Sequence, residues 1–136
     1  MTAHSVLVGG SIADRRIHCP ASFQEQLKAP PGLTSVYAEH GTAMHEAMAH
    51  WLQNPDDELV GQIFNDHGIT DEDVDTLLTP AWDSLVELQE AYGGGFKVAG
   101  LEVRVAFPGI AGAFGTVDVI LESPSHFIVA DFKFGA

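Results

Sequence analysis

The sequence predicts an α/β chain of the α+β-like kind, in which a small, mainly antiparallel sheet is flanked by helices. Apolar residues recur with the helical period before residue 92 and with a period of two after residue 96. Gly93-Gly94-Gly95 separates these two halves. At 136 residues the chain suits a single domain, 1–136, with a helical half over 1–92 and a strand-rich half over 96–136.

The helical half contains three predicted helices. Ser11 is placed to cap a short helix that ends near Cys19-Pro20. Thr34 or Ser35 can cap a second helix that reaches about Gln53 and buries one apolar stripe, made of Met44, Ala47, Met48, Trp51 and Leu52.

The third helix is predicted from the capping sequence Thr70-Asp71-Glu72-Asp73 to about Tyr92. Its buried face consists of Val74, Leu77, Leu78, Ala81, Leu85 and Leu88. On the second helix, His45 lies at the edge of the apolar stripe, where it can point into a cleft.

Three strands follow, over residues 101–107, 116–121 and 127–133, and the last two form a hairpin. If Pro124 and Ser125 are the loop residues, Asp118 lies directly opposite Asp131. One face of the hairpin is then apolar and belongs to the core, with Val117, Val119, Leu121, Ile128, Ala130, Phe132 and Phe134.

The other face of the hairpin gathers charge at the end away from the turn. Asp118, Asp131 and Lys133 share it, and directly opposed Cβ atoms lie about 5 Å apart. Two carboxylates this close repel each other unless a cation lies between them, and Mg²⁺ or Mn²⁺ prefers such oxygen ligands. An ordinary ion pair on a solvated sheet face explains the same spacing equally well.

At these residues the sequence resembles the PD-(D/E)XK nuclease superfamily, in its RecB-like exonuclease branch and a phage-associated group of nucleases within it. The likeness spans nearly the whole chain. Three blocks carry it: 11–22 (SIADRRIHCPAS), 41–46 (GTAMHE), and 115–118 (GTVD) followed by 129–135 (VADFKFG).

The resemblance implies a restriction-endonuclease-like core and a magnesium- or manganese-dependent deoxyribonuclease that acts on DNA. It implies that Asp118 and Asp131 bind the metal, that His45 joins them, and that Lys133 assists the attacking water. Glu102 matches a glutamate often found on the preceding strand and is a second candidate catalytic residue.

The chain departs from this family pattern in two respects. Members of the branch continue past the lysine, whereas this chain stops at Ala136, which implies a C-terminally incomplete domain. Some relatives hold an iron–sulfur cluster with four cysteines, whereas Cys19 stands alone here, so no cluster is expected. Apolar residues left exposed by a missing C-terminal portion would favour self-association.

Charge and hydropathy limit the remaining function classes. The net charge of −13, with only 6 Lys+Arg, argues against DNA binding through a broad basic surface, so contact with DNA must be local or mediated by the metal. A missing C-terminal region or a DNA-binding partner could supply a basic groove. No membrane span or signal peptide is evident, which indicates a cytoplasmic protein. Two alternatives stay open, a non-catalytic acidic module that mimics DNA and an inactive remnant that binds metal.

Overall fold

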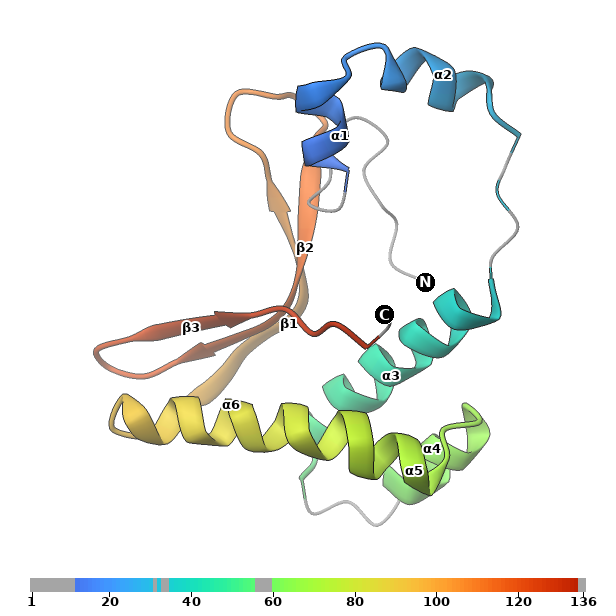
Figure 1. Ribbon diagram of the computed structural model, residues 1–136. Coiled ribbons are helices and arrows are strands. Elements are labelled where there is room, and N and C mark those ends of the chain that lie inside the picture. The colour runs from blue at the N-terminus through green and yellow to red at the C-terminus, as the bar shows by residue number, and fades with distance from the viewer. Residues whose placement is uncertain (1–11, 31, 33–34, 56–59, 135–136) are drawn as a thin grey trace.

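The computed structural model describes residues 12–30, 32, 35–55 and 60–134. Within them the fold is α+β, as predicted: helices come first and a three-stranded antiparallel sheet follows (Figure 1). The elements are α1 (Ala13–His18), α2 (Ser22–Lys28), α3 (Val36–Gln53), α4 (Val60–Asp66), α5 (Asp71–Asp73), the π-helical turn η1 (Val74–Leu78), α6 (Thr79–Ala91), β1 (Lys97–Ala106), β2 (Phe114–Glu122) and β3 (Phe127–Ala130).

Helix α3 begins and packs as its sequence predicts. The Ser35 Oγ accepts a hydrogen bond of 3.1 Å from the Ala38 N–H, which satisfies one of the backbone donors that every helix start leaves open. Its buried residues are Ala43, Met44, Ala47 and Met48, whereas Trp51 and Leu52 of the predicted stripe are only partly buried. The two other candidate caps, Ser11 and Thr34, lie outside the described residues.

The predicted third helix is one continuous helical run through α5, η1 and α6. Thr70 and Asp73 form the expected capping box, because each side chain accepts a hydrogen bond from the other residue's backbone N–H. Leu78 and Leu85 are buried, whereas Leu88 is 40% exposed. The prediction of a buried Leu88 was wrong, because the sheet residues that cover this face gather around Leu85.

Two short helices, α2 and α4, were not predicted. No residue of α2 is buried, and α4 buries only Val60. Neither helix therefore carries the apolar stripe by which a helix is read from a sequence.

The hairpin of β2 and β3 has the predicted register. Val119 pairs with Ala130 and Leu121 with Ile128, and the Ser123 N–H donates to the His126 carbonyl at 2.9 Å. The expected end of β3 at Lys133 was wrong, because the ladder stops at Ala130. The Phe132 N–H donates instead to the Asp118 carboxylate at 2.6 Å, so a side chain takes the donor that would have continued the ladder.

Strand β1 is irregular between Val98 and Glu102. Its pairing with β2 shifts by one residue between Val98 and Gly100, and Glu102 has a φ of 49°, the left-handed region that side chains other than glycine rarely adopt. A Cβ at Gly100 would lie only 2.4 Å from Val103 Cγ2. The regular alternation expected from Leu101 to Phe107 is therefore broken at Glu102.

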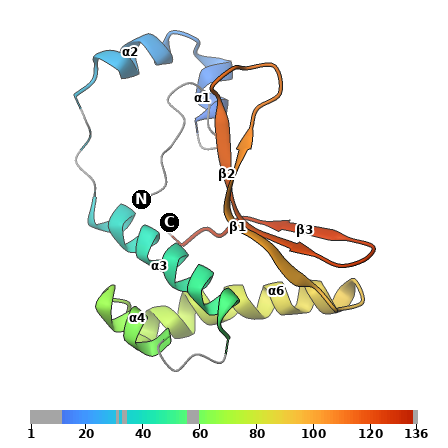
Figure 2. The same cartoon turned by 180° about the vertical axis from the view of Figure 1, so that it is seen from behind.

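The core consists of two neighbouring clusters. One joins the buried face of α3 to Ile69, Leu78 and Phe134, and the other joins Leu85 of α6 to the sheet residues Val119, Leu121 and Ile128. Leu52 and Phe132 pack against both clusters, so they connect α3 with the sheet. Figure 2 shows α6 running along the hairpin and α3 beside the segment that follows β3.

Candidate functional site

The site is built around Asp118, in the middle of β2. Its side chain is 16% exposed, and its Oδ2 accepts the hydrogen bond from the Phe132 N–H. Burial raises the pKa of Asp118 above its usual value, and the Phe132 hydrogen bond opposes this by stabilising the charged form. The fold therefore holds a carboxylate in surroundings that disfavour its charge.

His45 of α3 faces this carboxylate. Its Nδ1 lies 3.4 Å from Asp118 Oδ2, although the two residues are far apart in the sequence. The imidazole is 28% exposed and lies edge-on to the Phe134 ring, with 5.2 Å between ring centroids. The helical spacing predicted that His45 lies at the edge of the apolar stripe and can point into a cleft, and in the structure His45 lines a small pocket beside the sheet.

Glu102 lines the same small pocket as His45 and Asp118. The left-handed backbone at Glu102 costs of order 1–3 kcal/mol, and such strain persists where the surrounding structure enforces it, often at functional sites. Apolar groups form most of the remaining wall, which is lined by Ala49, Leu52, Leu101 and Phe132. The pocket therefore combines three titratable side chains with apolar neighbours.

Asp131 and Lys133 lie beside this pocket and bond to each other. Their side chains form an ion pair, and they are 52% and 80% exposed, respectively. Both charges reach Asp118, because Asp131 raises its pKa and Lys133 lowers it. Of the two acids and the amine that were predicted to group, Asp118 thus lies in the wall of the pocket. Asp131 and Lys133 lie at its more exposed rim.

Two of the expected metal ligands, His45 and Asp118, lie close to each other. His45 Nδ1 and Asp118 Oδ2, at 3.4 Å, are near the roughly 3 Å that separates neighbouring ligands around Mg²⁺ or Mn²⁺ at bond lengths of about 2.1 Å. Across the described ranges, no three His, Cys, Asp or Glu side chains converge closely enough to hold a metal ion. Asp131, the third expected ligand, is paired with Lys133.

The sequence did not indicate the part played by Phe132 and Phe134. Both were expected only on the apolar face, yet the Phe132 N–H binds Asp118 and both rings lie against His45, at centroid distances of 6.5 and 5.2 Å. Their alternation with Asp131 and Lys133 was the available signal, because it places aromatic rings between the charged residues of the motif.

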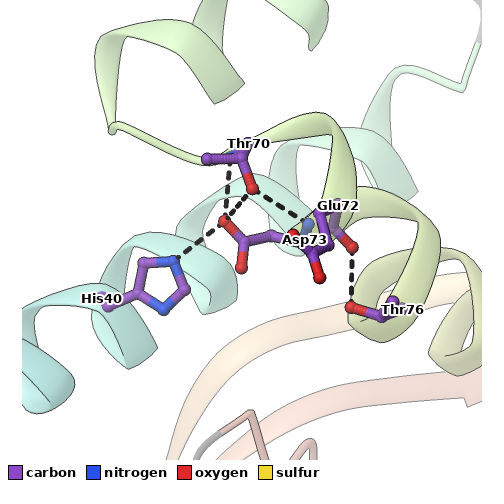
Figure 3. Close-up of polar contacts among 5 residues, drawn as sticks. All are labelled: His40, Thr70, Glu72, Asp73 and Thr76. Atoms are coloured by element: carbon purple, nitrogen blue, oxygen red, sulfur yellow. Dashed lines mark hydrogen bonds and ion pairs between the residues drawn. The ribbon is translucent and has the colours of Figure 1, made fainter.

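A second polar cluster connects α3 with the start of α5 (Figure 3). His40 Nε2 lies 3.3 Å from Asp73 Oδ2, and the same carboxylate oxygen accepts hydrogen bonds from the Thr70 N–H at 2.8 Å and the Thr70 hydroxyl at 2.7 Å. These bonds lower the pKa of Asp73, those from Thr70 most of all. The cluster completes a helix cap and fixes the position of α3, so its role is structural.

A comparison with known protein families gives a match over nearly the whole chain. A family model described as a protein of unknown function, DUF2800, matches residues 4–136. No curated protein matches the chain, and neither does any solved structure. None of the described helices is long and apolar enough to cross a membrane.

Proposed function

The chain belongs to the DUF2800 family of proteins of unknown function, and we propose that it is a divalent-metal-dependent deoxyribonuclease of the RecB-like exonuclease type. The observation that carries the proposal is the contact of 3.4 Å between His45 and Asp118. The resemblance to PD-(D/E)XK nucleases implies this pairing of a helix histidine with the first motif aspartate. Sequence spacing alone does not bring the two residues together.

Each site residue has a role that its surroundings support. Asp118 and His45 would hold the cation, and Asp131 would complete the set. A bound Mg²⁺ or Mn²⁺ supplies Lewis-acid stabilisation of phosphate charge and lowers the pKa of a coordinated water. The burial that raises the pKa of Asp118 disfavours its ionised form, and a bound cation would stabilise that form.

Lys133 and Glu102 would act on the phosphate and on the attacking water, respectively. Lys133 is 80% exposed at the rim, where its ammonium can stabilise charge on a phosphate oxygen. Glu102 lines the pocket itself and can accept a proton from the attacking water. The proposed reaction is direct hydrolysis of a phosphodiester by water, which needs no covalent intermediate.

The net charge of −13 disfavours the approach of DNA to this site. With 6 Lys+Arg in the chain, attraction of the phosphate backbone depends on the bound cation and on a partner or further segment that supplies positive charge. The same charge favours a second candidate function, a non-catalytic acidic module that occupies a basic groove in another protein.

A nuclease assay on linear DNA, with Mn²⁺, Mg²⁺ or EDTA present, tests the proposal. We expect metal-dependent cleavage that is abolished in Asp118→Asn and Lys133→Ala. Glu122→Gln is the matched control, because it removes another acid of β2 whose side chain is exposed, and it should cleave like the wild type. A chain that binds metal without cleaving is the inactive remnant. Salt-sensitive binding to a basic protein that persists in Asp118→Asn identifies the acidic module.

A further inference from the structure

An arginine lies on the same face of the sheet as Asp118. Arg104 of β1 pairs in register with Thr116 of β2, so the two side chains share one face. Asp118 follows Thr116 by two residues along β2 and therefore lies on that face too. The Cβ atoms of diagonal neighbours such as Arg104 and Asp118 are about 7–8 Å apart. Arg104 is thus a neighbour of the candidate site.

An aromatic ring holds the guanidinium of Arg104. The Cζ atom of Arg104 lies 3.3 Å from the centroid of the Phe114 ring, and Phe114 is only 9% exposed. Phe114 precedes Thr116 by two residues, which places its ring on the same face. The ring contacts the flat surface of the guanidinium. The N–H donors point outward in the plane of that group, so they stay available to a ligand.

Arg104 differs in its partners from two other cations of the chain. Lys28 pairs with Glu25, and Lys133 pairs with Asp131. Arg104 is exposed and forms no ion pair with a carboxylate across the described ranges, although the chain contains 19 Asp+Glu. An exposed arginine without an acidic partner can bind an anion from solution.

The proposed substrate brings phosphates to this face. A guanidinium binds a phosphate through two parallel hydrogen bonds. Asp118 and Glu102 line the pocket and would repel an anion, and a bound divalent cation offsets their charge. Phosphates recur about every 3.4 Å of helix axis along each DNA strand. A strand held at the cation would therefore bring further phosphates within reach of Arg104.

We propose that Arg104 binds a DNA phosphate next to the one at Asp118, with its guanidinium held by Phe114. This inference rests on the proposed function, because the DNA strand must lie at the Asp118 pocket. Arg104 positions the strand and takes no part in the cleavage step. In a chain with a net charge of −13, it supplies a local contact with DNA that is independent of base sequence.

Fluorescence anisotropy with a short fluorescein-labelled DNA, as a duplex and as a single strand, measures this contact. Ca²⁺ replaces Mn²⁺ in the buffer, because it also binds oxygen ligands, and a gel checks that the DNA stays intact. Arg104→Ala removes a charged hydrogen-bonding group and should weaken binding about tenfold or more. The slope of log affinity against log salt should also become shallower by about 0.7–0.9, the value for one phosphate contact.

Lys97→Ala is the matched control, because it removes one positive charge from the same strand. Lys97 is exposed and pairs in register with Glu122, four residues along β2 from Asp118. This variant should bind DNA nearly as well as the wild type. Arg104→Lys keeps the charge but lacks the planar fork of donors, so its affinity should lie between those of the wild type and Arg104→Ala. Circular dichroism checks that each variant folds.

Two further measurements separate this contact from the metal site and from cleavage. In calorimetric titration with Mn²⁺, Arg104→Ala should bind the metal like the wild type. A wild type that binds DNA without cleaving it in Mn²⁺, together with weak binding by Arg104→Ala, would contradict the nuclease and support the Arg104 contact. Cleavage by the wild type, together with equal DNA affinity of Arg104→Ala, would overturn the contact alone.

Three other results would also overturn the proposal. The first is a loss of affinity in Lys97→Ala that equals the loss in Arg104→Ala, because net charge would then explain both. The second is a wild type that binds neither form of the DNA. The third is a loss of Mn²⁺ binding in Arg104→Ala, which would show that Arg104 acts through the metal site.

Discussion

Replacing Gly100 by alanine adds one methyl group to the irregular stretch of β1 that leads to Glu102. The new Cβ would lie 2.4 Å from Val103 Cγ2. Carbon atoms in favourable contact are about 3.5–4.0 Å apart, so the two groups must separate by more than about 1 Å. Val103 is β-branched and has few alternative rotamers, so part of this movement falls on the backbone around Glu102.

Overpacking of this kind typically costs 1–3 kcal/mol, so we expect Gly100→Ala to lower the free energy of unfolding by about that amount in urea denaturation. Gly41→Ala is the matched control. Gly41 lies inside α3, and a Cβ there meets no atom within 4 Å. Because glycine is a poor helix former, the control should raise the free energy of unfolding by about 0.5–1 kcal/mol.

Replacing glycine by alanine should thus lower the free energy of unfolding at Gly100 and raise it at Gly41. Adding Val103→Ala to Gly100→Ala removes the clashing methyl, and the double variant should regain much of what Gly100→Ala loses relative to Val103→Ala alone. A Gly100→Ala variant as stable as the wild type would refute the close approach of Gly100 and Val103. So would a loss of stability in Gly100→Ala that the added Val103→Ala leaves unchanged.

Three further predictions concern the capped helix and the buried acid. Thr70→Ala removes the side-chain acceptor of the capping box and should cost about 1 kcal/mol in thermal or urea unfolding; an unchanged midpoint would show that the cap adds nothing in solution. Asp73 has a lowered pKa in the fold, so its ionised form contributes stability above the unfolded-state pKa, and this contribution is lost as pH falls through the folded-state pKa. Asp73→Asn should therefore be less stable than the wild type at pH 7, with the difference shrinking in acid. Asp118 has the opposite shift, so the wild type loses stability as pH rises from the unfolded-state pKa to the raised folded-state pKa. Asp118→Asn keeps an oxygen acceptor for Phe132 and should be more stable than the wild type at pH 7 but not at strongly acidic pH; an equal difference at both pH values would contradict a buried charge as the cause.

The sequence predicted those parts of the fold that depend on periodicity and local capping. The stripe of α3, the Thr70 cap and the hairpin register each follow from neighbouring residues, and the structure confirms them. The short helices α2 and α4 escaped prediction because they bury almost no apolar surface.

The geometry of the candidate site depends on side-chain contacts that compete with regular strand pairing, and the period of the sequence does not predict such contacts. Alternation predicts that β3 continues to Lys133, but the Asp118 carboxylate takes the N–H of Phe132 and the ladder ends. Alternation likewise predicts a regular strand through Glu102. The close approach of Gly100 and Val103 is part of an irregular stretch that positions Glu102 differently, and no local pattern encodes that packing.

Calorimetric titration of the wild-type chain with Mn²⁺ tests the central claim most directly, because it needs neither DNA nor turnover. The account predicts a site that is lost in Asp118→Ala and in His45→Ala and kept in Glu122→Ala, whose side chain lies exposed at the end of the same strand. Manganese binding that survives removal of both Asp118 and His45, or a wild type that takes up no Mn²⁺, would contradict it.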